Sequence, residues 1–180
     1  GLKGVGVLKS PAEFSFIVGG EQEGGNRAGT ENFPGVAAML AALEESESFV
    51  ETPILEKARN EFEESLRASI PGVKVLGESV PRLWNVSALL MPSFDNLRWV
   101  GKLEKMGHEV STGSACATGK DGPSHVSAAM GLSPEQARRV VRVSSSRETT
   151  PVEWSALADA FRLASAELQA DSSSSEVVSI

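Results

Sequence analysis

Residues 83–91 read LWNVSALLM, and residues 137–147 read ARRVVRVSSSR. The first run is almost wholly apolar and the second alternates around Arg139 to Ser144, so both predict β-strands of one partly buried sheet. Each strand carries an unexpected polar side chain, Asn85 in the first and Arg142 in the second. A buried polar group needs partners. Arg142 therefore faces water, forms a structural ion pair, or points into a cleft where its guanidinium can clamp a carboxylate.

The rest of the chain alternates between short apolar runs and helical stripes. In one helix, Leu55, Phe62, Leu66 and Ile70 form the apolar stripe, and the opposite face is expected to carry the charges, Arg59 and Glu63 included. Pro residues mark several helix starts, and capping boxes are expected at Ser133 with Gln136 and at Thr150 with Glu153. Further strands are expected at 4–8, 14–18, 73–76 and 108–111, and helices at 34–50, 53–70, 96–106, 124–130 and 151–169. The fold class is therefore α/β or α+β, a small sheet flanked by helices.

Composition excludes several classes of protein. The chain has 180 residues, 41% hydrophobic and 23% charged, which is ordinary for a globular domain. Its net charge of −7 argues against nucleic-acid binding, and no apolar run reaches the length of a membrane span. One cysteine allows no internal disulfide, so a reducing compartment is expected, the cytoplasm or an organelle matrix. The start of the sequence shows no signal-peptide pattern.

Cys116 lies in the run STGSACATGKDG, among small and polar residues rather than bulky apolar ones. Such a setting favours an accessible, reactive thiol, although a small residue filling a gap accounts for it equally well. The histidines, His108 and His125, do not have metal-ligand spacing to Cys116, so no metal site is expected. His125, nine residues after Cys116, leaves a Cys–His dyad open as an alternative.

The run from Gly19 to Asn32 contains five glycines in fourteen residues and predicts a loop with unusual backbone demands. Arg27, Gly29 and Thr30 occur together in it. Freed amides, a hydroxyl and a guanidinium suit a phosphate oxyanion. A surface turn with a solvated arginine is the alternative, but fourteen residues of this composition favour the functional interpretation.

Taken in order, four segments resemble the carboxy-terminal half of cysteine desulfurases, pyridoxal-phosphate-dependent enzymes of fold type I related to class V aminotransferases. The segments are GGEQEGGNRAGTENFPGVAAM, PRLWNVSALL, STGSACATGKDGPSHVSAAMGL and ARRVVRVSSSRETT. The resemblance implies that sulfur from L-cysteine passes to an enzyme cysteine as a persulfide, leaving alanine. It also implies a homodimer that hands the sulfur to an acceptor protein, such as a scaffold for iron–sulfur cluster assembly.

The resemblance assigns roles residue by residue. Cys116 matches the nucleophile, and Arg142 matches the arginine that holds the substrate carboxylate. Thr30 matches the residue that reaches the cofactor phosphate of the neighbouring subunit, and Arg27 belongs to the same cofactor-binding segment. Asn85 matches a motif position and is expected to take part in substrate binding.

The departures from the family pattern matter as much. By alignment, the lysine that forms the Schiff base precedes Gly1, and Lys3 corresponds to a different position. The cofactor-binding domain is otherwise missing too, so this chain alone is expected to be inactive. The resemblance divides the chain into a remnant of the large domain at 1–33, a small domain with its connecting helix at 34–170, and a disordered tail at 171–180. Two other functions stay open: a non-catalytic persulfide carrier or interaction module, and a thiol hydrolase that uses Cys116 with His125.

Overall fold

The computed structural model describes residues 3–12, 15, 17–47, 52–113 and 125–176. The chain divides into two compact units, Gly1–Val50 and Glu51–Ile180, and each is described by itself. The sequence placed a boundary after residue 33, whereas the structure groups the helix that follows with the first fifty residues. The assignment of these parts to a large and a small domain stays a prediction.

The first unit contains a short 3₁₀ helix, η1 (Gln22–Gly25), and the helix α1 (Phe33–Glu47). The strand expected at 4–8 is wrong, because these residues form no strand and Val7 and Leu8 are 83% and 70% exposed. A strand needs a neighbour to satisfy its backbone groups, and none of the described residues of this unit supplies one there. At 14–18 the described residues form only one isolated bridge, between Ile17 and Arg27.

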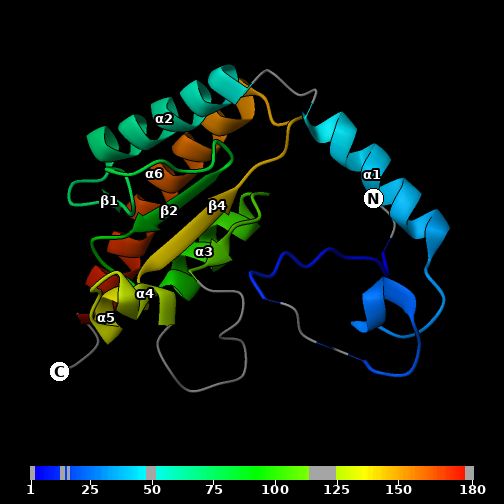
Figure 1. The fold of residues 1–180 in the computed structure, drawn as a ribbon. Coiled ribbons are helices and arrows are strands. Elements are labelled where there is room, and N and C mark those ends of the chain that lie inside the picture. Colours follow the sequence, from blue (N-terminus) through cyan, green and yellow to red (C-terminus); the bar gives the residue numbers. More distant parts are fainter. Residues whose placement is uncertain (1–2, 13–14, 16, 48–51, 114–124, 177–180) are drawn as a thin grey trace. The chain divides into compact units, whose positions relative to one another are not determined.

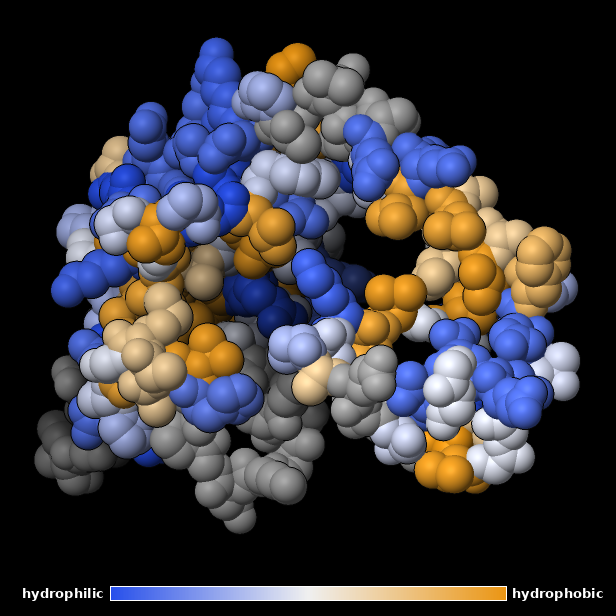
Figure 2. Space-filling view, in the orientation of Figure 1, coloured by the Kyte–Doolittle hydropathy of each residue, from blue (hydrophilic) through white to orange (hydrophobic). Residues whose placement is uncertain are grey.

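Helix α1 begins one residue before Pro34, and the side-chain oxygen of Asn32 accepts a hydrogen bond from the Gly35 amide at 3.1 Å. Its apolar side chains are not packed: Phe33, Leu40 and Leu43 are each at least half exposed. Figure 2 shows hydrophobic surface along this helix, in contrast to the hydrophilic outer surface of the helix α2 (Thr52–Ser69) in the second unit. The apolar stripe of α1 is therefore a surface that the first unit does not cover itself.

The second unit is built on a four-stranded antiparallel sheet (Figure 1). Its strand order is β1-β2-β4-β3, with bounds β1 (Lys74–Val75), β2 (Val86–Leu90), β3 (Ser111–Thr112) and β4 (Val140–Ser144). The two central strands, β2 and β4, lie within the runs at 83–91 and 137–147, and they pair along their whole length. All ladders are antiparallel, so the fold is of the α+β kind within the class expected.

The sheet has one core face and one face that carries Arg142. Leu89 pairs with Val141 and Ser87 with Val143, and all four side chains are buried on the core face. Side chains alternate along a strand, so Ala88 and Arg142, which pair with each other, lie on the opposite face. Both are half-buried.

Two helices, α2 and α3 (Asn96–Lys105), pack against the strands, and α6 (Pro151–Glu176) packs against both of these helices. Aromatic rings from all three meet there. The ring centres of Phe62 and Trp154 are 4.9 Å apart, and the Phe161 ring lies 5.9 Å from both Phe62 and Trp99. Two short helices, α4 (His125–Ala129) and α5 (Pro134–Ala137), precede β4. The apolar stripes expected for the helices at 53–70 and 151–169 therefore lie in the core, whereas the stripe of the helix expected at 34–50 is exposed.

Both capping boxes are confirmed. The Ser133 hydroxyl accepts from the Gln136 amide, and the Thr150 amide and hydroxyl donate to Glu153 at 2.7 and 2.8 Å. Helix α6, however, continues past the Gln169 at which the pattern ended it. Residues 171–176, expected in a disordered tail, are helical. The Nζ of Lys102 on α3 forms an ion pair with Asp171 at 3.0 Å, which stabilises this last part of the helix. The serine-rich composition of residues 172–175 did not indicate a helix.

Candidate functional site

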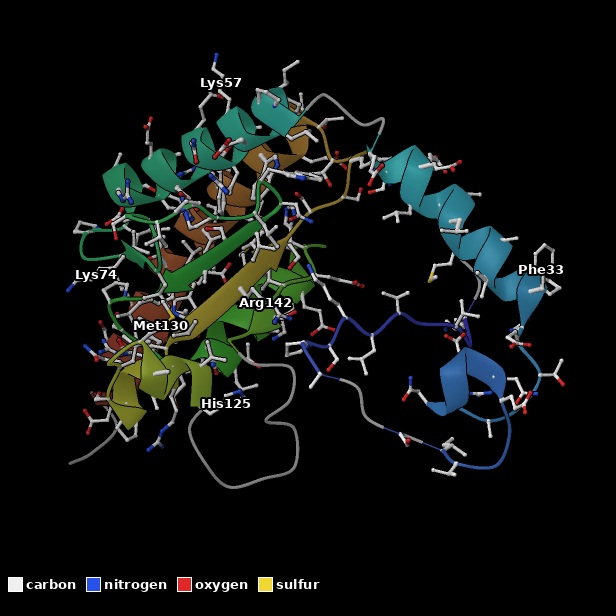
Figure 3. The ribbon with its side chains drawn as sticks, viewed as in Figure 1. Phe33, Lys57, Lys74, His125, Met130 and Arg142 are labelled. Atoms are coloured by element: carbon white, nitrogen blue, oxygen red, sulfur yellow. The ribbon has the colours of Figure 1, made fainter. Side chains whose placement is uncertain are left out.

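Arg142 lies in the middle of β4, and the sheet fixes its neighbours (Figure 3). Across one ladder it pairs with Ala88 on β2, and across the other with Ser111 on β3. The side chains of directly paired residues lie on the same face of the sheet. The Arg142 side chain is therefore flanked by the Ala88 methyl group on one side and the Ser111 hydroxyl on the other. The strand position predicted for Arg142 is confirmed.

The guanidinium of Arg142 is incompletely bonded. Its Nε is shielded from solvent and has no hydrogen-bond partner in the described part of the chain. A buried donor left unpaired costs about 1–3 kcal/mol, and most native structures avoid this. Of the alternatives set out for Arg142, a structural ion pair is therefore not supported by any contact of the described residues, and a site that awaits an acceptor fits best.

Asn85 is hydrogen-bonded to Ser145, just after the end of β4. Its backbone oxygen accepts a hydrogen bond from the Ser145 amide at 2.9 Å, and its Nδ2 donates to the Ser145 carbonyl at 3.4 Å. Ser145 comes three residues after Arg142 along the chain, so the two predicted substrate-binding residues belong to the same pair of strands. Substrate contact by Asn85 stays a prediction.

The two predicted phosphate-binding residues lie in the first unit. The Arg27 Nη1 turns back to the Ala28 carbonyl at 2.8 Å, and the Ala28 amide donates to the Ile17 carbonyl at 2.7 Å. Arg27 and Thr30 are both exposed. The glycine-rich run is a loop as expected, with left-handed backbone at Glu23, Gly24 and Gly25. Its phosphate-binding role stays a prediction.

Cys116 lies outside the described residues, between Gly113 and His125. The stretch that leads to it is well fixed, because the Gly113 amide donates to the Val140 carbonyl at 2.9 Å. Gly113 also packs so close to β4 that an added Cβ would lie 2.8 Å from Cγ1 of Val140. The ladder between β3 and β4 thus positions the start of the cysteine segment beside the arginine strand.

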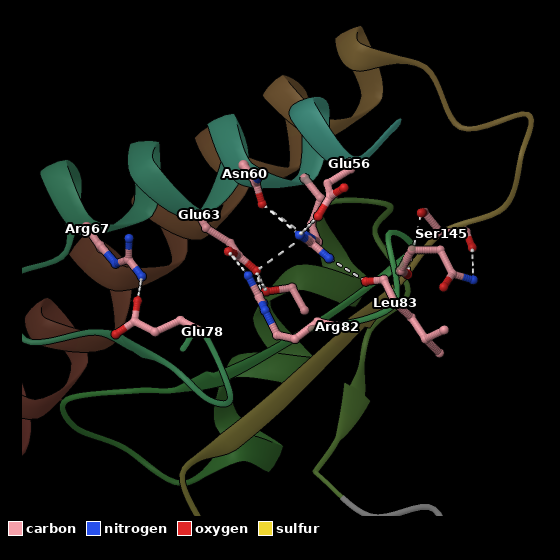
Figure 4. Close-up of polar contacts among 11 residues, drawn as sticks. Glu56, Asn60, Glu63, Arg67, Glu78, Arg82, Leu83 and Ser145 are labelled. Carbon is pink, nitrogen blue, oxygen red and sulfur yellow. Dashed lines mark hydrogen bonds and ion pairs between the residues drawn. The ribbon is translucent and has the colours of Figure 1, made fainter. Parts of the chain in front are cut away.

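Another group of polar side chains, which we call the Glu63 network, was not predicted from the sequence (Figure 4). The Glu63 carboxylate receives Arg82 at 2.8 and 2.9 Å and the Ser87 hydroxyl at 2.7 Å. Arg59, one turn earlier on α2, donates to the Leu83 carbonyl and to the Asn60 side chain. Arg59 and Glu63 are 2% and 3% exposed, so placing them on the solvent face of α2 was wrong.

The electrostatics of this cluster follow from its contacts. Burial alone would raise the pKa of Glu63, but the hydrogen bonds from Arg82 and Ser87 and the two guanidinium charges outweigh burial and hold it below its ordinary value. Hydrogen bonding to Glu63 raises the pKa of Arg82 in turn. The sequence contains one sign that Arg59 and Glu63 are buried. Each directly follows a residue of the apolar stripe, Ala58 or Phe62, and so the two charged residues have the same four-residue spacing as that stripe.

Two hollows of the second unit are lined by neither Arg142 nor Asn85. One of about 130 Å³ lies between His108 and the start of α6, and one of about 310 Å³ lies over the charged side chains of the Glu63 network. Within the described ranges, no three His, Cys, Asp or Glu side chains are grouped as a metal site. None of the helices in those ranges is both long and apolar enough to span a membrane.

The architecture of this chain is similar to that of solved structures. No protein-family model matches the chain. A NifS-like protein from Rickettsia africae superposes with a TM-score of 0.68 and 28% identity, over 83% of this chain and 39% of that one. A second NifS-like protein gives a TM-score of 0.62 and 27% identity, over 83% and 38%. The fold is that of a part of the NifS-like enzymes.

Proteins related in sequence give a more specific class, the cysteine desulfurases. A cysteine desulfurase of Rhodobacter capsulatus is 38% identical over 159 residues, 86% of this chain and 41% of its own length. The cysteine desulfurase NifS of Azotobacter vinelandii is 36% identical over 156 residues, 84% and 39%. The chain is therefore similar to the carboxy-terminal part of the cysteine desulfurases. It spans about two fifths of the length of the curated relatives it matches.

Proposed function

We propose that this chain works as the carboxy-terminal part of a cysteine desulfurase, in which Arg142 binds the carboxylate of L-cysteine and Cys116 accepts its sulfur. The unpartnered Nε of Arg142 is the observation that carries the proposal. A planar guanidinium forms two parallel hydrogen bonds with a carboxylate, and the carboxylate would supply the acceptor that this donor lacks. Relatives named as cysteine desulfurases supply the reaction class.

The proposed chemical step is a sulfur transfer to Cys116. The Cys116 thiolate forms a bond to the substrate sulfur while the bond between that sulfur and its carbon breaks. The electron pair of the broken bond stays with the carbon, which takes up a proton to give alanine. Pyridoxal phosphate, when bound, supplies the electron sink for this carbon. The persulfide on Cys116 then passes its outer sulfur to an acceptor protein.

The described residues fit only a small part of a pyridoxal-phosphate site. Thr30 is an exposed hydroxyl, and the Arg27 guanidinium is bonded to its own loop. No lysine of this chain is assigned to the cofactor. We therefore propose that the lysine and the ring-binding residues correspond to the part of the relatives that this chain does not match. A homodimer is proposed as well, because the family pattern brings Thr30 to the neighbouring subunit's cofactor.

The experiment that tests the proposal is a chimera. This chain replaces the matching part of the Rhodobacter capsulatus relative, and cofactor absorbance shows whether the chimera has assembled. It should then release alanine from L-cysteine. Cys116→Ser should keep the cofactor absorbance and lose persulfide, whereas Arg142→Lys should mainly raise KM. An assembled chimera that makes no alanine, or that makes persulfide equally well with Cys116→Ser, contradicts the proposal.

A further inference from the structure

Ser111 lies directly opposite Arg142 on the face of the sheet away from the helices. We propose that the Ser111 hydroxyl binds the same carboxylate as Arg142, so that the two residues form one substrate-binding pair. This inference rests on the proposed function, since it takes Arg142 as the carboxylate-binding residue. It adds a second hydrogen-bond donor from a different strand.

The register makes this pairing specific. Ser111 pairs with Arg142 and Thr112 with Val141, and the Gly113 amide donates to the Val140 carbonyl. Hydrogen-bonded and non-hydrogen-bonded pairs alternate in an antiparallel ladder, so Ser111 and Arg142 form a hydrogen-bonded pair, with Cα atoms about 5.5 Å apart. Thr112 faces the other side of the sheet with Val141, so Ser111 presents the β3 hydroxyl on the face of Arg142.

The atom that lacks a partner also points to Ser111. Among the guanidinium nitrogens, Nε is the nearest to the backbone, and it is the one recorded as buried without an acceptor. A serine side chain is short, so of the three guanidinium nitrogens the inner one, Nε, is the closest in level to the Ser111 hydroxyl. One carboxylate oxygen can therefore accept from both the Arg142 Nε and the Ser111 hydroxyl, while the second oxygen accepts from a terminal nitrogen.

The Ser111 hydroxyl is not used elsewhere. It has no hydrogen-bond partner within the part of the chain that the structure describes, and Ser111 is half-buried. On the opposite side of Arg142 stands Ala88, which offers only a methyl group. The polar side of the arginine is therefore the β3 side, the same strand that leads through Gly113 toward Cys116.

The test uses the whole 180-residue chain, labelled with ¹⁵N, and follows by NMR the backbone amide resonances of β3 and β4 in every variant, Arg142→Met included. Where Arg142 is present, its Nε–H resonance, assigned with Arg142→Lys, is followed as well. The probe is sodium L-alanine, which carries the carboxylate of the proposed product. L-alaninamide, which lacks the carboxylate, is the control ligand. Ser111→Ala removes the hydroxyl and Ser111→Thr keeps it. Ser144→Ala is the matched control, because it deletes a hydroxyl from the same face two residues along β4.

The wild-type chain should show a saturable shift with L-alanine and none with L-alaninamide. Ser111→Ala should weaken L-alanine binding about tenfold, because hydrogen bonds to charged groups are among the stronger ones. Ser111→Thr and Ser144→Ala should stay within about threefold of wild type. If Arg142→Met abolishes binding while Ser111→Ala leaves it unchanged, the role of Ser111 is overturned and that of Arg142 stands. If the wild type shows no saturable shift, or Arg142→Met still binds, the carboxylate role of Arg142 is overturned too.

Discussion

Glu63 on α2 and Arg82 are held together by two parallel hydrogen bonds of 2.8 and 2.9 Å, although nineteen residues separate them in the chain. The carboxylate of Glu63 also accepts from Ser87 on β2. One acidic side chain therefore joins a helix, a strand and the segment between them. The arginines on this side of the sheet are satisfied within the chain, whereas the Nε of Arg142 on the other side is not.

Glu63→Ala should lower the free energy of unfolding by about 3 kcal/mol, because it leaves two arginines and a serine without their common partner in a largely buried cluster. Denaturant unfolding followed by circular dichroism measures this. The control is Glu61→Ala on the same helix, whose carboxylate is exposed and 3.6 Å from Lys57. It should change stability by less than about 0.5 kcal/mol. Equal losses in both variants would contradict the structural role of Glu63.

The stability of the second unit should fall in acid through Glu63. Its pKa in the folded chain is below the ordinary value of 4.5, so the unfolded state binds the proton first. The stabilisation is therefore fully present above about pH 5 and is lost as the pH falls from 4.5 through the lower pKa of the folded chain. Unfolding curves from about pH 3 to pH 7 should show a shallower acid slope in Glu63→Gln. An unchanged slope would mean that other carboxyl groups dominate.

Arg142→Met should leave the free energy of unfolding unchanged or raise it by up to about 1 kcal/mol, because it removes an unpaired buried donor and keeps most of the aliphatic packing. Arg59→Met is the matched comparison. That arginine is more deeply buried than Arg142 and is bonded to Leu83 and Asn60, so its loss should cost about 3 kcal/mol. If the two variants lose the same stability, Arg142 is a structural residue.

Gly113→Ala should destabilise the chain by about 1–3 kcal/mol, because the new Cβ would lie 2.8 and 2.9 Å from Cγ1 and Cβ of Val140 and force β3 away from β4. Gly101→Ala on α3 is the control, since an added Cβ there meets nothing within 4 Å. It should stabilise the helix by about 0.5–1 kcal/mol. Thermal unfolding of both variants should thus give shifts of opposite sign.

Much of the second unit could be predicted from sequence, because local patterns and tertiary packing agree there. The run LWNVSALLM and its partner around Arg142 became the central strands, and the stripe at Leu55, Phe62 and Leu66 became a buried helix face. The capping boxes at Ser133 and Thr150 are local signals and were found where expected.

The predictions that were wrong concern residues whose surroundings are set by distant parts of the chain. Arg59 and Glu63 were assigned to solvent because they are charged, yet Glu63 is paired with Arg82, and Arg59 is paired with Glu56 and donates to the Leu83 carbonyl. Arg82 and Leu83 come from a distant segment, which a local pattern does not identify. The apolar run at Val7 and Leu8 has strand composition, but the described residues of its unit supply no neighbouring strand, so propensity alone could not form one. The Arg142 position was predicted, but its pairing with Ser111 required the register of the sheet.

The two edge strands of the sheet, β1 and β3, are only two residues long. A short edge offers few free amide and carbonyl groups to a strand from another molecule, so it is a poor template for intermolecular β-pairing. Together with the internal core of this unit, that geometry suits residues 51–180 for study as a separate polypeptide that resists aggregation. Concentrated samples of that unit would then allow the arginine face to be examined without the exposed apolar helix of the first fifty residues.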